Sequence, residues 1–450
     1  MERSAVQTEK GEKRLVIERR GRRAHIWLPL GAEGLDPAVE QNVHEVLAFP
    51  YLAGDFVLMP DHHLGYGVPI GSVLPTDQAV IPYAIGVDIG CGMCSFKTSV
   101  DLNRFGDWED RLHLVVERLK KTIPVGFNSK QEPSYVGRRV SVDEVKALIG
   151  ADRFDPYHFS FKAAKKLRFD PAFWEKNMRK FALQMGTLGG GNHFIELQVD
   201  QYGMLWVTIH SGSRNLGYTM CNLFTAAARN LYLERGVPFK RDLSPLMLSE
   251  KEGRAYLAVH DICCRAAKRN RADMMYQVVR HIDGVFGTSD QERVRQWALR
   301  EVSLEEEWKV GDEESVPFDM PHNFGRFEYH QGRRVFIHRK GATPATPDQL
   351  VIVPGAMNTK SYICVGLGSE ESYQSSAHGA GRKLGRREAI RTIPDKVAHD
   401  DLRGIITSFN PARVKDELGR AYKDVDSVIG AEKSLVRVLY ELKPLASVKG

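Results

Sequence analysis

The feature that most constrains this chain is a short apolar segment that ends in a glycine-rich turn carrying polar side chains. The first example is the apolar run at residues 55–59, which continues into Pro-Asp-His-His-Leu-Gly-Tyr-Gly. The pattern recurs five times, in turns at residues 86–92, 189–194, 209–214, 321–324 and 377–382. Strand ends of this kind bring polar side chains and backbone N–H groups together around a ligand. We therefore expect distant segments to build one site.

Hydrophobic periodicity predicts the main elements. Short apolar runs between breakers predict buried strands at residues 55–59, 194–199, 204–209, 334–337, 349–353 and 361–365. Residues 159–185 and 219–286 show helical spacing, and the acidic stretch 301–315 is expected to be a solvated loop or helix end. No Pro-, Ser- or Gly-rich linker divides the chain. We predict one α+β domain over residues 1–450, with central β-sheets around the site and a helical excursion at about 219–290.

Composition places the chain among ordinary globular proteins. Of its 450 residues, 42% are hydrophobic and 27% are charged, enough for a core without disulfides. Six cysteines are too few for a disulfide framework and point instead to metal binding or catalysis. No run reaches the ~18 apolar residues of a membrane span, and residues 1–23 are charged throughout, so we expect a cytoplasmic protein. The net charge of +6 permits contact with nucleic acid without requiring it.

Five side chains in the glycine-rich turns are candidate metal ligands, namely Asp88, Cys91, His193, His210 and His322. A lone histidine is more often a core or surface residue than a ligand. Together, however, the five supply a carboxylate, a thiolate and imidazoles, enough for two divalent ions with positions left open for substrate. Ligand softness alone would accept zinc, manganese or iron.

A second interpretation of Cys91 is a redox Cys-x-x-Cys pair, or half of a zinc knuckle, formed with Cys94. No second Cys-x-x-Cys exists in the sequence to complete four thiolates. Cys94 is therefore expected to be a buried packing residue.

The usual nucleotide-binding motifs are missing. Residues 355–361 resemble the end of a P-loop, but Thr359 stands where a glycine must precede the lysine, and the Lys-x-Asp-Gly signature of lysine-nucleotidylating ligases is absent. Neutral imidazole attacks phosphorus and forms a reactive phosphoramidate, so His378 is a candidate nucleophile. The glycine-rich run 379–381 lets backbone approach phosphate oxygens, and Arg382 would either pair with them or hold the turn.

The order of the motifs resembles one family. Pro-Asp-x-His-x-Gly-Tyr-Gly, Asp-x-Gly-Cys-Gly, Gly-x-Asn-His-Phe, His-Ser-Gly-Ser-Arg and His-Gly-Ala-Gly-Arg follow one another along the chain. Together they resemble the RtcB family of RNA ligases, over a match from about Gln41 to residues 449–450. The resemblance implies an enzyme that joins RNA ends bearing a 2′,3′-cyclic phosphate or 3′-phosphate to 5′-hydroxyl ends, in RNA repair or tRNA splicing. It also implies GTP and two Mn²⁺ ions as cofactors.

The resemblance further implies roles for individual residues. His378 would take GMP, and the five candidate ligands would hold the metals, with Cys91 bridging both ions. Asp61 and Arg214 would lie near the metals and the RNA phosphates, and Glu196 would read the guanine edge. The full GTP site would comprise Asn192, His193, Phe194, Ile195, Glu196, His322, Asn323, Pro354, Gly355, Ala356, Met357, Ser361, His378, Gly379, Ala380, Gly381 and Lys449.

The implied reaction has two steps after guanylylation. The RNA 3′-phosphate, freed from any cyclic form by metal-bound water, would attack His378-GMP to give an RNA-3′-pp-5′-G end, and the 5′-hydroxyl would then displace GMP. Metals would neutralise charge on the transferring phosphoryl groups while the protein supplies alignment. The partner would be RNA with broken ends, without a membrane, and the need for an archease-type activator stays open. The oligomeric state stays open.

Three segments depart from the usual family pattern. The usual Pro-Gly-Ser-Met-Gly-Thr loop has Ala356 and Asn358 here, the usual Asp-Glu-x-Pro ends in Gly419, and the usual Ser-Arg pair after His-Gly-Ala-Gly-Arg is replaced by Gly385-Arg386. The loss of the serine hydroxyl at Ala356 predicts weaker GTP binding. The chain is therefore expected to be an active but divergent paralogue.

Two alternatives compete with the ligase. One is a metal-dependent phosphoesterase that opens cyclic phosphates but no longer ligates, because the guanosine site has changed at Ala356 and Asn358. The other is a protein without catalysis that binds RNA ends or a partner. The second is disfavoured, because a site that had lost catalysis would have no chemical reason to keep a thiolate and several imidazoles together.

Overall fold

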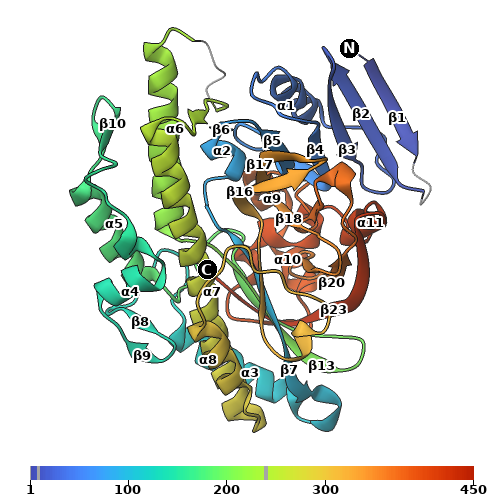
Figure 1. Ribbon diagram of the computed structural model, residues 1–450. Coiled ribbons are helices and arrows are strands. Elements are labelled where there is room, and N and C mark those ends of the chain that lie inside the picture. Colours follow the sequence, from blue (N-terminus) through green and yellow to red (C-terminus); the bar gives the residue numbers. More distant parts are fainter. Residues whose placement is uncertain (1, 8–10, 238–241) are drawn as a thin grey trace.

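The computed structural model describes residues 2–7, 11–237 and 242–450 of the chain. Two large β-sheets form its centre, and helices pack against them (Figure 1). The predicted α+β class is confirmed. None of the helices described is both long and apolar enough to cross a membrane.

The first sheet has seven strands, which run antiparallel to their neighbours except for the parallel pair β3–β4. In spatial order the strands are β1 (Glu2–Gln7), β2 (Lys13–Arg19), β3 (Arg22–Trp27), β4 (Phe56–His63), β5 (Ile70–Thr76), β17 (Arg333–Lys340) and β16 (Asn323–His330). Helix α1 (Pro37–Leu47) covers one face, since its buried valines belong to the same hydrophobic cluster as β3 and β4.

The second sheet contains the longest strand described, β23, between β12 and β20. In spatial order it contains β15 (Phe318–Pro321), β7 (Gly92–Asp101), β13 (Met204–Ser211), β12 (Phe194–Val199), β23 (Val436–Lys449), β20 (Ser361–Gly366) and β19 (Leu350–Val353). These strands are antiparallel, and the short β22 (Ile406–Thr407) runs parallel to β23. The inner faces of the two sheets share one hydrophobic cluster, in which Val57 and Ile337 lie with Val351 and Cys364.

Short strand pairs and further helices complete the fold. The pairs are β6 (Ala79–Val80) with β14 (Leu246–Met247), β8 (Ser134–Tyr135) with β9 (Arg138–Arg139), β10 (Phe161–Ala164) with β11 (Leu167–Phe169), and β18 (Ala342–Pro344) with β21 (Ser375–Ala377). The helices are α2 (Pro82–Ile85), α3 (Trp108–Thr122), α4 (Val142–Leu148), α5 (Pro171–Gln184), α6 (Asn215–Glu234), α7 (Lys251–Phe286), α8 (Asp290–Leu299), α9 (Arg386–Thr392), α10 (Asp395–Asp401) and α11 (Val425–Gly430).

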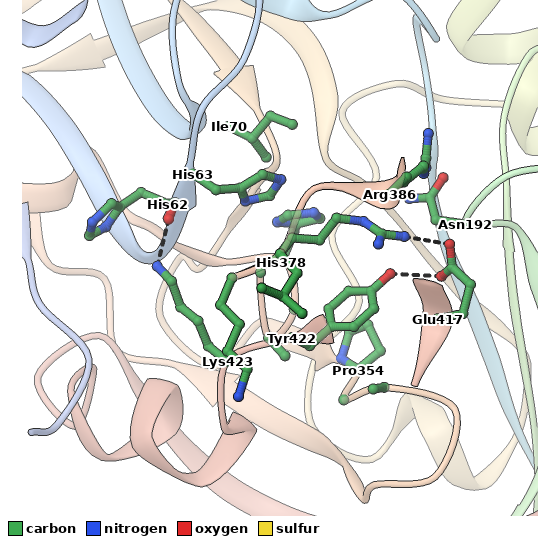
Figure 2. A pocket seen from close by; sticks show the side chains of 18 of the residues that line it. His62, His63, Ile70, Asn192, Pro354, His378, Arg386, Glu417, Tyr422 and Lys423 are labelled. Carbon is green, nitrogen blue, oxygen red and sulfur yellow. Dashed lines mark hydrogen bonds and ion pairs between the residues drawn. The ribbon is translucent and has the colours of Figure 1, made fainter. Parts of the chain in front are cut away.

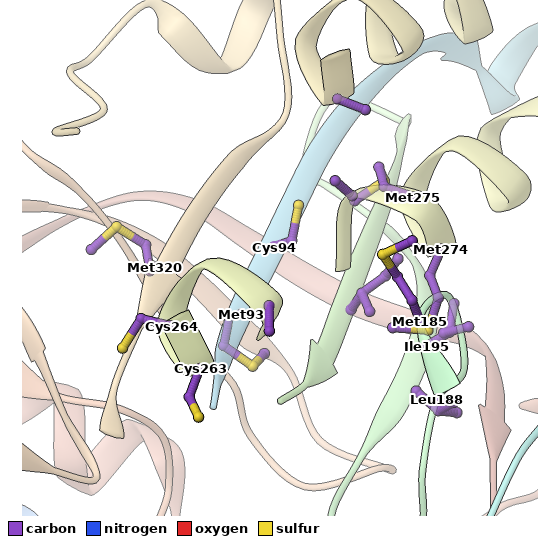
Figure 3. Packing of buried hydrophobic residues seen from close by; sticks show 14 of the residues in the cluster. Met93, Cys94, Met185, Leu188, Ile195, Cys263, Cys264, Met274, Met275 and Met320 are labelled. Carbon is purple, nitrogen blue, oxygen red and sulfur yellow. The ribbon is translucent and has the colours of Figure 1, made fainter. Parts of the chain in front are cut away.

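Helix α7 packs along the second sheet and shares the largest hydrophobic cluster with it. Buried methionines and cysteines are frequent at this contact. Met93 and Cys94 of β7 lie near Cys263, Cys264 and Met274 of α7 (Figure 3). The outer helices therefore belong to the same packed core as the strands that carry the candidate ligands.

All six predicted strands are present, in β4, β12, β13, β17, β19 and β20. The prediction of a helical segment over 159–185 is wrong in its first half, where β10 and β11 form a hairpin. Phe161 and Phe169 pair in register and both contact Phe224 of α6, so aromatic packing overrides the helical spacing. The helical block predicted over 219–286 consists of two helices, α6 and α7, and the acidic stretch is mostly loop, as expected.

Candidate active site

The candidate ligands meet at one edge of the second sheet, because their strands are neighbours there. Cys91 directly precedes β7, His210 lies on β13, and His193 directly precedes β12. The register places Phe194 opposite His210. His322 follows β15, which pairs with β7. The sheet thus gathers side chains that are distant in the chain.

Cys91, His193 and His210 form a compact buried group. Cys91 Sγ lies 3.5 Å from His193 Nε2 and 3.3 Å from His210 Nε2, and the three ligand atoms lie within 4.8 Å of one another. His193 Nε2 is also 3.2 Å from Asp88 Oδ2. A Cβ at Gly212 would stand 2.0 Å from that oxygen. The glycine of the His-Ser-Gly-Ser-Arg turn is therefore required by the approach of Asp88.

Backbone carbonyls orient two of the imidazoles. His193 Nδ1 lies 3.0 Å from the carbonyl oxygen of Leu188, and His210 Nδ1 lies 3.1 Å from that of Asn192. Because a carbonyl only accepts, Nδ1 of each ring donates to it, and Nε2 of each ring points toward Cys91. Burial lowers the pKa of His210 well below its usual value, which keeps this ring neutral.

His322 extends the row of imidazoles toward His378. Its ring centroid lies 5.0 Å from that of His210 and 4.8 Å from that of His378, in edge-to-face contacts. Burial lowers the pKa of His322, and its Nδ1 is buried without a hydrogen-bond partner among the described residues. A buried nitrogen left without a partner beside a thiol and two imidazoles fits the position of a metal ligand.

The donor set fits a divalent transition-metal ion. Burial opposes the ionisation of Asp88, but the hydrogen bond and charge of His193 outweigh it and lower the pKa. Burial, assisted by Asp88, raises the pKa of the Cys91 thiol well above its usual value. A cation among these groups would favour the thiolate, because a coordinating thiol loses its proton. One carboxylate, one sulfur and three imidazoles around one buried space suit such an ion.

Arg271 in the middle of α7 holds the turns that carry the ligands. Its buried guanidinium forms a two-pronged ion pair with Asp319 of β15, with N–O distances of 2.6 and 2.8 Å. Its Nη1 also donates to the carbonyls of the residues that precede Cys91 and follow His210, at 2.9 and 2.7 Å. One side chain therefore links three strands of the sheet at the ligand positions.

Asn270 holds the adjoining turns in place through hydrogen bonds to their backbones. Its Nδ2 donates to the carbonyl of Gly212 at 3.0 Å, and its Oδ1 accepts from the backbone N–H groups of Gly186 and Thr187 at 2.7 and 3.1 Å. Sequence analysis missed Asn270 and Arg271, because neither lies in a glycine-rich turn. Both lie in the largely polar run 268–273 of α7, whose pattern does not separate buried from exposed positions.

His378 is backed by a buried carboxylate. His378 Nδ1 lies 2.5 Å from Asp61 Oδ2, and the backbone N–H of His378 donates to the same oxygen at 3.3 Å. A Cβ at Gly381, whose φ is +70°, would stand 1.9 Å from the carbonyl oxygen of Asp61. The glycine-rich turn therefore lets β4 and the His378 segment touch. Asp61, expected near the metals, lies behind His378, and its contact leaves Nε2 as the reactive nitrogen.

Arg214 begins α6 in a backbone conformation that L-residues rarely adopt, with φ 57° and ψ −145°. Its Nε donates to Thr187 Oγ1 at 3.0 Å and its Nη2 to the carbonyl of Gly126 at 2.8 Å. Burial lowers its pKa, with Asp88 opposing the shift. Such strain persists only where the surroundings enforce it, which marks this turn as functionally constrained.

A pocket of about 820 Å³ opens over His378, a volume that suits a nucleotide-sized ligand. Figure 2 shows His378 near its centre, with His62 and His63 on one side and Glu417 and Tyr422 on the other. The expected residues that line it are Asn192, Phe194, Glu196, His210, His322, Pro354, Gly355, Ala356, Met357, His378, Gly379, Ala380, Gly381 and Lys449.

Other expected residues lie behind the pocket wall. Ile195 is fully buried in the core. Ser361 Oγ accepts the N–H of Gly355 at 3.3 Å and so supports the loop that lines the pocket. Asn323 Nδ2 donates to the carbonyl of Asp88 at 3.4 Å and thus contacts the turn that carries Asp88 and Cys91. Among the other side chains that line the pocket, His62, His63, Met93, Tyr422 and Lys423 were not predicted from the sequence.

Arg382 holds the turn at residues 379–381 in place, which is one of the two roles expected for it. It forms an ion pair with Glu417, donates to the carbonyl of Asp416 at 2.5 Å, and lies over the Tyr422 ring at 4.6 Å. Glu417 also accepts from Tyr422 at 2.7 Å and pairs with Lys449 at 3.3 Å. These contacts fix one wall of the pocket beside His378 (Figure 2).

Two of the departures from the family pattern contact each other. Asn358 Oδ1 accepts the backbone N–H of Gly419 at 2.7 Å, an N–H that the usual proline would lack. A Cβ at Gly419 would stand 3.2 Å from the same oxygen and 3.0 Å from Thr359 Cγ2. Asn358 therefore turns toward the Gly419 segment instead of the nucleotide pocket. The two substitutions compensate for one another.

We expect the free energies of unfolding of variants at these two positions to be coupled. Asn358→Gly should cost about 1 kcal/mol because it removes a hydrogen bond, and Gly419→Pro should cost more, since it removes the donor and crowds Asn358. The double variant should lose less than the sum of the two. Leu418, with ψ 155°, already has the extended backbone that precedes a proline. Urea unfolding of the four proteins measures the coupling, and simple additivity would contradict the pairing.

These observations define a class: an α+β protein with a buried cysteine–histidine group suited to a metal ion, next to a pocket that holds a carboxylate-backed histidine. The comparisons with known proteins agree. The family model described as "tRNA-splicing ligase RtcB" matches residues 42–450. The chain belongs to the RtcB family.

Curated relatives resemble the chain over nearly its whole length. It is 33% identical to the RNA-splicing ligase RtcB of Escherichia coli K12 over 91% of this chain and 93% of that protein. It is 30% identical to the RNA-splicing ligase RtcB of Mycobacterium tuberculosis H37Rv, covering 91% and 100%. It is 29% identical to the tRNA-splicing ligase RtcB of Thermococcus kodakarensis, covering 92% and 91%.

Proposed function

We propose that this chain is a GTP-dependent RNA ligase that joins 3′-phosphate or 2′,3′-cyclic phosphate ends to 5′-hydroxyl ends, in tRNA splicing or RNA repair. The observation that carries the proposal is the His378–Asp61 pair, 2.5 Å apart, at the pocket beside the Cys91–His193–His210 group. The names of the relatives, RNA-splicing and tRNA-splicing ligases, support the class of substrate.

The base of GTP would lie at Glu196. Burial raises the pKa of this carboxyl to about 8, with Lys449 opposing the shift, and Gln198 is its hydrogen-bond donor at 2.9 Å. The N–H groups on the Watson–Crick edge of guanine would add two donors and favour the carboxylate. Adenine presents a ring acceptor there, so Glu196 would favour GTP over ATP.

His378 would act as the nucleophile on GTP. Its Nε2 attacks the α-phosphorus, the bond to the β-phosphate oxygen breaks, and pyrophosphate leaves. Asp61 holds the Nδ1 proton, so that Nε2 keeps its lone pair and the cationic ring that forms is stabilised. The backbone around Gly379 and Gly381 lets the phosphate lie close to the turn.

The RNA 3′-phosphate would then take the GMP. One of its oxygens attacks the phosphorus on His378, the P–N bond breaks, and the imidazole is restored. The 5′-hydroxyl oxygen next attacks the RNA phosphorus, and GMP leaves with the former bridging oxygen. Two Mn²⁺ ions held by Asp88, Cys91, His193, His210 and His322 would neutralise charge on these phosphoryl groups.

Incubation with GTP and Mn²⁺ tests the proposal directly. We expect the intact protein to gain the mass of one GMP residue, on His378, by mass spectrometry of protein kept at neutral or alkaline pH. ATP should give little gain, because Glu196 selects guanine. A protein that opens 2′,3′-cyclic phosphates under the same conditions but gains no GMP would be the metal-dependent phosphoesterase and would contradict the ligase.

A further inference from the structure

A basic face lies outside the pocket, on the β10–β11 hairpin and on α5 at the left edge of the view in Figure 1. Its cationic side chains are exposed, and none of them forms an ion pair with a described residue. The hairpin contributes Lys162, Lys165, Lys166 and Arg168. One side of α5 contributes Lys176, Arg179 and Lys180.

The charge of the chain is concentrated on this face. Residues 160–185 contain seven basic and two acidic side chains, a net charge of +5, whereas the whole chain carries +6. Both acids are engaged elsewhere. Asp170 caps α5 by accepting the N–H of Phe173 at 2.8 Å, and Glu175 pairs with Lys146 at 2.8 Å. The net charge of +5 already counts both acids, so the face keeps a positive field.

The other side of the hairpin is firmly packed. The ring of Phe161 lies 5.3 Å from that of Phe224 on α6, and the ring of Phe169 lies 5.8 Å from it. Phe169 is fully buried. The hairpin thus presents its cations from a fixed platform.

Helix α5 leads from the hairpin to the turns that carry the candidate metal ligands, called the metal turns below. Its 14 residues span about 21 Å at 1.5 Å per residue. Four residues after α5 ends, the carbonyl of Leu188 accepts from His193 Nδ1 at 3.0 Å. The backbone N–H of Lys130 donates to the carbonyl of Leu183 at 2.9 Å and brings the 124–130 loop to the same end of the helix.

That loop presents Phe127, whose side chain is fully exposed. The backbone before it is fixed, because the N–H of Gly126 donates to the carbonyl of Gly189 at 2.8 Å and its own carbonyl accepts from Arg214. A large apolar ring held in water beside a constrained arginine gains nothing from the fold itself. An exposed ring of this kind suits stacking against a nucleobase.

We propose that the basic face of β10–β11 and α5 binds the phosphate backbone of single-stranded RNA and leads it past Phe127, on which a base stacks, to the metal turns. This inference rests on the proposed function, which supplies the RNA. Charge complementarity favours a polyanion, and the exposed aromatic ring at the end of the face favours a nucleic acid over an acidic protein.

Two glutamine variants test the face. Lys162, Lys165, Lys166 and Arg168 are replaced in one, and Lys176, Arg179 and Lys180 in the other. Fluorescence anisotropy of a labelled RNA with a 3′-phosphate measures affinity against salt concentration. Each variant should bind at least about tenfold more weakly at low salt, and the slope of log K against log salt should fall by about 0.7 for each phosphate that the variant no longer binds. Guanylylation without RNA should stay unchanged.

The matched control removes three exposed but ion-paired cations elsewhere, in Arg23→Gln, Arg104→Gln and Arg295→Gln. It lowers the net charge as much as the α5 variant does and should leave the salt slope unchanged. An equal fall in the control would reduce the effect to net charge and overturn the proposal. Normal RNA binding by both face variants would also overturn the proposal. The same holds if the face variants lose binding of polyglutamate but not of RNA.

Phe127 is tested separately. Phe127→Ala should weaken RNA binding by roughly fivefold to 150-fold, Phe127→Trp should restore it, and Phe127→Leu should not, because leucine keeps the apolar area without the ring. Full binding by Phe127→Leu would overturn the stacking role. If wild-type protein fails to take GMP, the proposed function fails, but these binding measurements still decide whether the face holds RNA.

Discussion

Replacing His378 with alanine is expected to abolish the covalent gain of GMP. Because Asp61 leaves His378 Nε2 poised at the pocket, no neighbouring imidazole should take its place. His210 contacts the Cys91 sulfur, and His322 packs edge-to-face between the rings of His210 and His378. Radiolabelled GTP followed by gel electrophoresis measures the loss, and the bond on the wild-type protein should be labile to acid and stable to base, as a P–N bond is.

Two further variants complete this test. Asp61→Asn should keep the fold but lower the rate of labelling by roughly 10²-fold or more, since a neutral amide no longer stabilises the cationic ring and its NH2 group can donate to Nδ1, which favours the wrong tautomer. His399→Ala, on the exposed side of α10, should label normally. Labelling that survives His378→Ala would remove this residue as the nucleophile, whatever the behaviour of Asp61→Asn.

Cys91→Ala is expected to lose bound metal and, with it, both guanylylation and sealing. The Cys91 sulfur lies within 3.5 Å of two imidazole nitrogens, so it is the ligand that the whole group shares. If it bridges two cations, its loss removes the negative charge that offsets their repulsion. Metal content by mass spectrometry after dialysis against Mn²⁺ should fall by at least one ion per chain, independently of any activity.

Cys94→Ala is the matched control. Cys94 is equally buried, but it lies on β7 opposite Ile209 and packs in the core. Its replacement should lower the free energy of unfolding by about 1 kcal/mol through weaker packing, with metal content unchanged. A Cys91→Ala protein that retains its full metal content would rule out the bridging position.

Much of the architecture was predictable because the site residues sit where strands end. Short Val- and Ile-rich runs between breakers predicted six strands, all of which are present. Strand ends at one sheet edge then bring Cys91, His193 and His210 together. The β10–β11 hairpin was not predictable from periodicity, because the partner that stabilises it, Phe224, is distant in the sequence.

The supporting contacts were also hidden from the sequence. Arg271 and Asn270 act on turns that lie far from them in the chain, so nothing in the local pattern of α7 identifies their partners. The compensation between Asn358 and Gly419 could also be recognised only from the structure. From sequence, Asn358 looked like a change beside the nucleotide and Gly419 like a separate departure, whereas the structure makes them one rearranged contact.

The position of β23 has a consequence for how this protein folds. This strand lies between β12 and β20, where Phe194 pairs with Lys449 and Ser361 pairs with Leu442. Pairings across such sequence separations raise contact order, because long loops must close before any contact forms, and folding slows accordingly. Until residues 436–449 insert, β12 and β20 expose unpaired edges. A nascent or heat-stressed chain should therefore aggregate through the unpaired edges of β12 and β20. It should depend on chaperones more than a protein whose strands pair with neighbours close in the sequence.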